Sequence, residues 1–224
     1  MHPLDNPIWE SLVSGHARFA QGAGSARRFE PEVSVLAGFS GEVEDGLAAL
    51  AGVAAAGETV AVFMERAPKA APGWTVVRGG ELLQMVRAQG DFPASARELV
   101  ELGAGDAEEM LALAELARPG PFSRRTRELG LYLGVREGGR LAAMSGERLK
   151  LPGWTEISAV CSHPDHLGRG HAAALVSEVG RRIVERGDRP FLHVLPGNAR
   201  AIALYERLGF RTRTAFRYAV LRRV

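Results

Sequence analysis

The chain has 224 residues, of which 46% are hydrophobic and 24% charged, and its formal net charge is +2. This composition is that of a globular protein able to bury a core without disulfides, and the small net charge argues against non-specific nucleic-acid binding. The single cysteine, Cys161, excludes an intrachain disulfide and favours a reducing compartment. Residues 1–14 lack the pattern of a secretion signal, and no run approaches the roughly 20 apolar residues that span a bilayer. We therefore expect a cytoplasmic protein that binds neither nucleic acid nor a membrane.

The first part of the chain is rich in alanine and glycine and carries few distinctive patterns. Helices are expected over residues 8–20 and 43–56, and strands over residues 33–35, 59–62 and 74–77. The stretch 89–95 contains glycine, aspartate and proline and therefore predicts a boundary. We expect an α/β domain over residues 1–95 and a second domain over residues 96–224.

After this boundary, the hydrophobic pattern switches repeatedly between strand and helix periodicity. The dipeptide Gly138-Gly139 predicts a hairpin turn. This hairpin, followed by alternating strands and helices, predicts an α/β arrangement with a mixed sheet and excludes a purely parallel, doubly wound fold. The expected strands are 97–102, 131–136, 140–147, 154–162, 191–195 and a last segment after residue 209, and the expected helices are 106–117, 170–186 and 199–208.

A glycine-rich turn, Gly168-Arg169-Gly170-His171-Ala172-Ala173, opens one of these helices. It matches the dinucleotide pattern G-x-G-x-x-A, but that fingerprint begins directly at a strand end and is followed by an acidic residue after the next strand. Here residues 163–167 separate strand and turn, and residues 195–198 contain no carboxylate. The free N–H groups and the dipole of a helix N-terminus attract phosphate, and glycines let it approach closely. We therefore favour a phosphate-bearing ligand other than a dinucleotide over glycines that only relieve sterics.

Two motifs give the chain from residue 97 onward a resemblance to a known family. The first is Val160-Cys-Ser-His-Pro-Asp-His-Leu-Gly-Arg-Gly-His-Ala172, and the second is Asn198-Ala-Arg-Ala-Ile-Ala-Leu-Tyr-Glu-Arg-Leu-Gly-Phe210. They resemble the cofactor-binding motif and the following motif of the GNAT superfamily of acyl-CoA N-acyltransferases. The resemblance implies a GNAT-like fold and an enzyme that moves an acetyl group from acetyl-CoA directly to a primary amine of a small molecule or amino acid. Some members carry an extra domain that is a degenerate copy of the fold, and residues 1–95 are a candidate for one.

The resemblance also implies how the cofactor is held. Backbone groups of the strand before the turn would pair with the pantetheine amides, and backbone N–H groups of the turn would hold the pyrophosphate. The family usually has Arg or Gln where this chain has Leu167, which cannot donate to phosphate, so His166 or Arg169 would have to compensate. The implied cofactor-binding residues are Val160, Ser162, Gly168, Arg169, Gly170, His171, Ala172, Ala173 and Asn198.

Transfer from a thioester to an amine requires an uncharged amine and a proton for the departing thiolate. Tyr205, in the second motif, lies where the family places its acid, although its helical face would equally suit a core aromatic. Glu156 is the candidate base or amine-binding acid, with Glu147 or a water chain as alternatives. Strand alternation, if no bulge intervenes, places Glu156 on one face with Val160 and aims Cys161 away from it.

Other roles for these residues are less favoured. We interpret Cys161 as a small buried hydrophobe rather than a nucleophile. His163, Asp165, His166 and His171 straddle a turn and a helix start and do not converge on one ion, so no metal site is predicted. A module that binds acyl-CoA as a sensor, with little catalysis, remains the second functional hypothesis. Both a monomer and a homodimer fit the sequence.

Overall fold

Helices and strands alternate along the computed structural model, which describes residues 2–68, 71–87, 90, 92–93 and 97–224. The α-helices are α1 (Pro7–Val13), α2 (Val43–Ala51), α3 (Ala107–Ala117), α4 (His171–Glu185) and α5 (Ala199–Arg207). Short 3-10 segments are η1 (Pro3–Asp5), η2 (Ala17–Phe19), η3 (Ala104–Asp106), η4 (Thr126–Leu129) and η5 (Pro164–His166). The strands are β1 (Ala20–Gln21), β2 (Ala26–Phe29), β3 (Ala37–Phe39), β4 (Thr59–Met64), β5 (Trp74–Arg87), β6 (Val100–Glu101), β7 (Tyr132–Glu137), β8 (Arg140–Leu151), β9 (Trp154–Ser162), β10 (Arg189–Val194) and β11 (Phe210–Arg223).

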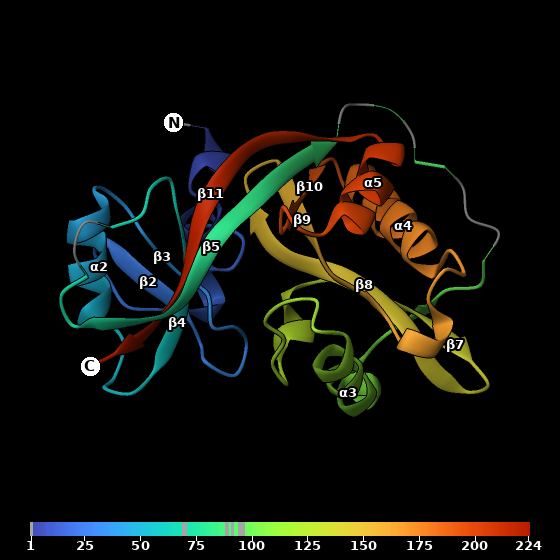
Figure 1. Cartoon of the computed structure of the whole chain (residues 1–224), viewed down its shortest axis with the longest axis horizontal. Coiled ribbons are helices and arrows are strands. Elements are labelled where there is room, and N and C mark those ends of the chain that lie inside the picture. Colours follow the sequence, from blue (N-terminus) through green and yellow to red (C-terminus); the bar gives the residue numbers. More distant parts are fainter. Residues whose placement is uncertain (1, 69–70, 88–89, 91, 94–96) are drawn as a thin grey trace.

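Most of the strands form one sheet of eight strands in the order β4-β11-β5-β10-β9-β8-β7-β6 (Figure 1), and a second sheet contains β1-β2-β3. The pair β9 and β10 is parallel, whereas the other neighbouring strands of the described part are antiparallel. The strands β7 and β8 form a hairpin around the predicted turn at Gly138-Gly139. The prediction of a mixed sheet that includes a hairpin is therefore confirmed.

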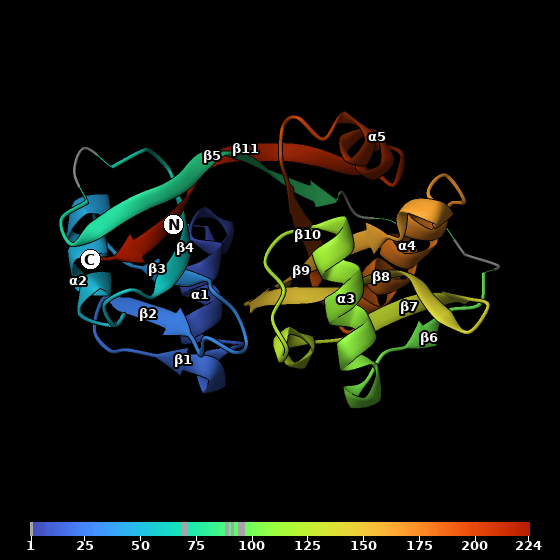
Figure 2. The ribbon, with the colours of Figure 1, turned by 60° about the horizontal axis from the view of Figure 1, so that its bottom comes forward.

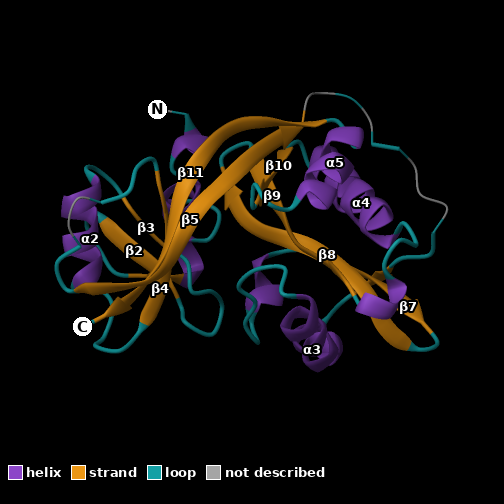
Figure 3. Cartoon of the chain, in the orientation of Figure 1, coloured by secondary structure: helices purple, strands orange, loops and turns teal. Residues whose placement is uncertain are grey.

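Helices cover both faces of the region formed by β7, β8 and β9 (Figures 2 and 3). On one face, α4 packs through Leu175, Val179 and Ile183, which belong to the apolar stripe expected from helical periodicity. On the other face, α3 packs through Met110 and Leu113. None of the helices within the described ranges has both the length and the apolar character needed to cross a membrane.

Two long strands, β5 and β11, lie side by side along the molecule and connect its two halves (Figures 1 and 2). Although β5 comes from the first half of the sequence, its residues 83–86 pair with β10, so that it lies between β10 and β11. The large sheet therefore includes strands from residues 1–95 and from residues 96–224. The division into two domains stays a prediction, and much of the expected boundary at 89–95 lies outside the described residues.

Several expected elements are shorter in the structure. The helix expected over residues 8–20 ends at Val13, because the chain turns at Gly15 to pass close to β8. A Cβ atom at Gly15 would lie 2.6 Å from the carbonyl oxygen of Lys150, so only glycine fits there. The other shortened elements are the helix 43–56, which becomes α2, the strand 97–102, which is reduced to β6, and the strand 33–35, replaced by an isolated bridge between Leu36 and Ala61.

Strand β5, in contrast, extends far beyond the expected residues 74–77. Its middle, Arg78-Gly-Gly-Glu81, favours a turn when taken alone. In the fold these two glycines allow β11 to approach closely. A Cβ atom would lie 2.9 Å from the Tyr218 carbonyl oxygen at Gly79 and 3.0 Å from the Tyr218 ring at Gly80. Pairing with β11 thus overrides the local preference.

Candidate active site

An opening lies between the parallel strands β9 and β10. They pair over three residues only, and the last pair is Glu156 with Phe191. Beyond that point β9 continues to Ser162 and β10 to Val194, each paired with its other neighbour. Val160 and Ser162, both half-buried, therefore lie on a stretch of β9 that has no strand partner on this side among the described residues. Backbone groups on such an edge can pair with an extended ligand.

The same stretch of β9 carries a bulge, which the sequence analysis did not foresee. The register against β8 shifts here, and Ala159 adopts a left-handed φ of 52°. A bulge reverses the sides taken by the residues after it. Val160 accordingly packs with the α4-side core, and Cys161 packs with the α3-side core beside Tyr132. Ile157, which follows Glu156 on the strand, also packs with the α4-side core, so Glu156 and Cys161 take the other side together. The expected alternation, with Cys161 directed away from Glu156, is therefore wrong.

The glycine-rich turn follows β9 and η5 and leads into α4. Gly168 and Gly170 have φ values of 79° and 81°, in the left-handed region that favours glycine. The first backbone bond into this part of the helix runs from the N–H of Ala174 to the carbonyl oxygen of Gly170. None of the six N–H groups from Gly168 to Ala173 donates to another residue of the described chain. A helix alone leaves four such donors, so this turn presents a larger cradle for an anion.

Cationic side chains lie beside this cradle, whereas the residue directly before Gly168 is apolar. A guanidinium nitrogen of Arg97 donates to the carbonyl oxygen of Arg169 at 2.7 Å. The same nitrogen lies 4.0 Å from the position that a Cβ of Gly170 would take. Leu167 is 52% exposed and offers no donor. Arg97, which the sequence analysis missed because of its distance along the chain, therefore adds positive charge to the turn together with Arg169.

His171, the first residue of α4, is buried and directed inward. Its Nε2 lies 3.5 Å from a carboxylate oxygen of Glu137, and its Nδ1 finds no partner within the part of the chain that is described. Burial, followed by the nearby charge of Arg97, lowers the pKa of His171. The imidazole is therefore neutral at physiological pH, and the charge of the cradle comes from the arginines and the backbone dipoles.

The second motif forms α5, which follows β10. Asn198 caps this helix by accepting a hydrogen bond from the N–H of Ala201 at 3.1 Å. Tyr205 is 6% exposed, and its ring packs edge-on against Phe210. Burial raises the pKa of Tyr205 to about 12. The hydroxyl therefore stays protonated at neutral pH, and its ring also belongs to the core.

Glu156 is fully buried at the point where β9 and β10 separate. Its Oε2 accepts a hydrogen bond from Arg148 Nε at 2.8 Å, and its Oε1 accepts one from Arg148 Nη2 at 2.6 Å. Nδ1 of His193 lies 2.7 Å from the same Oε1. Burial alone would raise the pKa of Glu156, but Arg148 and His193 outweigh it and lower the pKa to about 2. The carboxylate is therefore a permanent negative charge and a very weak base.

Sequence reasoning missed both partners of this carboxylate. The one available signal for His193 was an ionisable residue inside the otherwise apolar stretch 191–195. Arg148 lay just beyond the expected strand 140–147, and β8 in fact continues to Leu151. The structure thus brings together three ionisable residues from three neighbouring strands, only one of which the sequence singled out.

The alternative carboxylate, Glu147, is equally buried but lies in different surroundings. It forms ion pairs with Lys150 at 3.0 Å and with Arg186, which follows α4.

Cys161 is buried, as the sequence suggested, and burial raises the pKa of its thiol to about 12. The described residues contain no group of three or more His, Cys, Asp or Glu side chains that could hold a metal ion.

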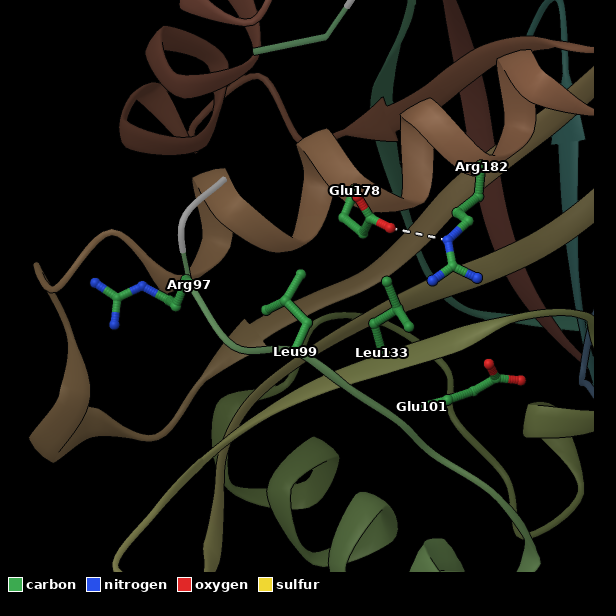
Figure 4. A pocket seen from close by; sticks show the side chains of 6 residues that line it. All are labelled: Arg97, Leu99, Glu101, Leu133, Glu178 and Arg182. Atoms are coloured by element: carbon green, nitrogen blue, oxygen red, sulfur yellow. Dashed lines mark hydrogen bonds and ion pairs between the residues drawn. The ribbon is translucent and has the colours of Figure 1, made fainter. Parts of the chain in front are cut away.

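A polar cavity of about 370 Å³ lies between α4 and the strands β6 and β7 (Figure 4). Inside it, Arg182 donates to Glu178 at 2.8 Å. Arg97 borders both this cavity and the glycine-rich turn, but none of the residues that the sequence predicted for cofactor binding or catalysis lines the cavity, so we place the active site elsewhere. The lining residues are Arg97, Leu99, Glu101, Leu133, Glu178 and Arg182.

Comparisons with known proteins point to one family. The family model described as FR47-like protein matches residues 132–219. A solved structure named as an acetyltransferase from the GNAT family of Novosphingobium aromaticivorans is 37% identical over 100% of both chains, with a TM-score of 0.92. A GCN5-related N-acetyltransferase from Kribbella flavida shares the fold at 17% identity and a TM-score of 0.61, covering 96% of this chain and 94% of that one. The search of curated proteins finds no match. The chain therefore belongs to the GNAT family and is an acetyltransferase.

Proposed function

We propose that this protein is a cytoplasmic N-acetyltransferase that moves an acetyl group from acetyl-CoA to the primary amine of a small molecule or amino acid. The observation that carries the proposal is a row of six N–H groups from Gly168 to Ala173, next to a stretch of β9 on the side of β10; within the described ranges neither has a backbone partner. A pyrophosphate fits such a row of donors, and an amide-bearing pantetheine fits such an edge. Acetyl-CoA carries both groups.

The residues present fit this co-substrate at both ends. Val160 and Ser162 offer backbone groups to the pantetheine amides, and the turn offers its N–H groups to the pyrophosphate. Arg97 and Arg169 add positive charge where Leu167 gives none. When bound, acetyl-CoA supplies the acetyl group as an activated thioester.

Transfer forms a bond between the amine nitrogen and the acetyl carbon and breaks the bond between that carbon and sulfur. The sulfur leaves as a thiolate, with a pKa of about 8.5 if it resembles cysteine. Full proton transfer from Tyr205, with its pKa of about 12, would be uphill by about 3.5 units, or roughly 5 kcal/mol. We therefore propose that Tyr205 donates a hydrogen bond to the leaving sulfur and that solvent completes its protonation.

On the acceptor side, Glu156 is proposed to bind the amine rather than to deprotonate it. With a pKa of about 2, it cannot take a proton from an ammonium group whose pKa is roughly 8 to 10. A carboxylate offers about four acceptor positions, and Arg148 and His193 occupy three of them. Among the described residues no donor takes the remaining position, which is on Oε2, and we propose that an N–H of the amine takes it. The amine loses one proton to water before it attacks, and its nitrogen loses a second proton to water as the amide forms.

A thiol-release assay with acetyl-CoA and a panel of amines tests this function. We expect thiol release to require an amine and to match the acetylated amine formed, as measured by mass spectrometry. Samples without amine provide the control for simple thioester hydrolysis. Tight binding of CoA without turnover on any amine would instead favour the second hypothesis, a catalytically weak module that binds acyl-CoA.

A further inference from the structure

A residue from the first half of the sequence reaches the acceptor side of the site. Gln84 lies on β5, directly opposite His193 on β10 and Thr214 on β11. Its side chain is fully buried. The amide nitrogen of Gln84 lies 3.3 Å from Nε2 of His193, which is the ring nitrogen that does not face Glu156.

Two neighbours fix the orientation of the Gln84 amide. Its oxygen accepts a hydrogen bond from Arg213 at 3.0 Å, and a guanidinium can only donate. Its nitrogen donates to the carbonyl oxygen of Leu4 at 3.0 Å, and a carbonyl can only accept. Turning the amide over would place oxygen against oxygen and N–H against N–H. The second N–H of Gln84 is therefore held toward Nε2 of His193.

This orientation determines where the imidazole of His193 carries its proton. Because an N–H of Gln84 faces Nε2, this nitrogen is the acceptor and bears no hydrogen. Nδ1 faces the ionised carboxylate of Glu156 and must be the donor. The result is a neutral ring in the Nδ1–H tautomer.

Among the residues that the structure describes, the other contacts of the His193 ring are aromatic rings from three strands. Arg148 bonds to Glu156 and Arg213 bonds to Gln84, the two side chains that face the ring nitrogens. The packed aromatic residues are Phe63, Phe191 and Phe216.

We propose that Gln84 is a positioning residue of the active site: it fixes the neutral Nδ1–H tautomer of His193 and thereby keeps a positive charge of the ring away from the Glu156 carboxylate, which is proposed to bind the amine. The Nδ1–H group occupies Oε1, which leaves the open acceptor position on Oε2 for the amine. The effect on turnover rests on the proposed function, whereas the tautomer does not depend on it. The first half of the chain thus supplies part of the acceptor side.

Nitrogen-resolved NMR of the histidine rings in the full chain tests the tautomer without any substrate. In the wild type at pH 7, we expect a proton on Nδ1 of His193 and none on Nε2. In Gln84→Met, which keeps the shape and removes both amide groups, we expect a proton on Nε2 as well, because Glu156 then favours the charged ring. The His193 signal is identified by its loss in His193→Phe, and Gln21→Met, at an exposed position of β1, is the matched control.

A wild-type ring protonated on both nitrogens at pH 7, or unchanged His193 signals in Gln84→Met, would overturn the inference. Should Gln84→Met fail to fold, Gln84→Glu keeps an acceptor for Arg213 but has no N–H to offer Nε2, and it is expected to give the same change of protonation. In kinetics, Gln84→Met should raise KM for the amine roughly fivefold, because the charged His193 ring then competes with the amine for the negative charge of Glu156, and leave KM for acetyl-CoA unchanged. A wild-type chain that acetylates no amine would refute the proposed function, and the NMR result would still decide the inference.

Discussion

Replacing Glu156 by glutamine removes the only negative charge that contacts Arg148 within the described chain. The side chains of Glu156 and Arg148 are 0% and 11% exposed, so solvent replaces little of the lost partner. Glutamine keeps the size of glutamate but leaves a buried guanidinium without a counter-charge. Such uncompensated buried charges are among the most destabilising changes known in proteins, at about 3–5 kcal/mol.

The lowered pKa of Glu156 gives a second estimate of the folding free energy that this variant loses. A fall from 4.5 to about 2 is about 2.5 units, which corresponds to about 3 kcal/mol of folding free energy. Because the folded-state pKa is depressed, this stability is fully present above pH 4.5 and is lost as the pH falls through about 2. At pH 3, less than half of it should remain. Both arguments therefore predict a loss of about 3 kcal/mol in Glu156→Gln at pH 7, and the lowered pKa adds that the loss is smaller at pH 3.

Urea unfolding of the wild type and the variant at both pH values measures these losses. Glu178→Gln is the matched control, since Arg181 and Arg182 also lower the pKa of Glu178 to about 2. Those two arginines are each 42% exposed, so solvent screens the pairs and the control should lose at most about 1 kcal/mol. Equal losses in the two variants, or a loss in Glu156→Gln that does not shrink at pH 3, would refute the reasoning.

Three further substitutions test other parts of the site. Tyr205→Phe should lower the rate of thiol release while leaving the acetyl-CoA affinity, measured by calorimetry, nearly unchanged. Tyr218→Phe is the control. Unfolding of the Tyr205 variant would show that this ring serves the core alone. Gly168→Ala should cost about 1 kcal/mol because of its positive φ and weaken acetyl-CoA binding, whereas Gly138→Ala, with a φ of 58° in the hairpin, should cost stability only. Tyr132→Phe should raise the free energy of unfolding by about 1 kcal/mol, because the Tyr132 hydroxyl is buried without a partner among the described residues. A loss of stability in that variant would contradict this account of the hydroxyl.

The parts of the site that follow from local rules could be predicted from the sequence. The apolar stripe of α4 and the two positive-φ glycines before it depend on periodicity and backbone sterics, which are local properties. The mixed sheet likewise followed from one hairpin signal and the order of the later elements. These features determine where the part of the site proposed to bind acetyl-CoA lies.

The acceptor end depends on tertiary packing and could not be predicted in this way. Glu156 has the sequence context of an ordinary strand residue, and its pairing with Arg148 depends on an irregular register between β8 and β9. Gln84 meets His193 only because β5 continues through Arg78-Gly-Gly-Glu81, where the sequence favours a turn. The bulge at Ala159, which reverses the faces of the residues after it, could not be predicted either, because nothing in the local sequence indicates a positive φ there.

The most direct test of the central claim is an equilibrium measurement of acetyl-CoA binding through its effect on stability. The account predicts that acetyl-CoA at one hundred times its dissociation constant raises the free energy of unfolding by about 2.7 kcal/mol. The rise should be smaller in Gly168→Ala at the same concentration. No change in the thermal unfolding of the wild type at millimolar acetyl-CoA would contradict the claim.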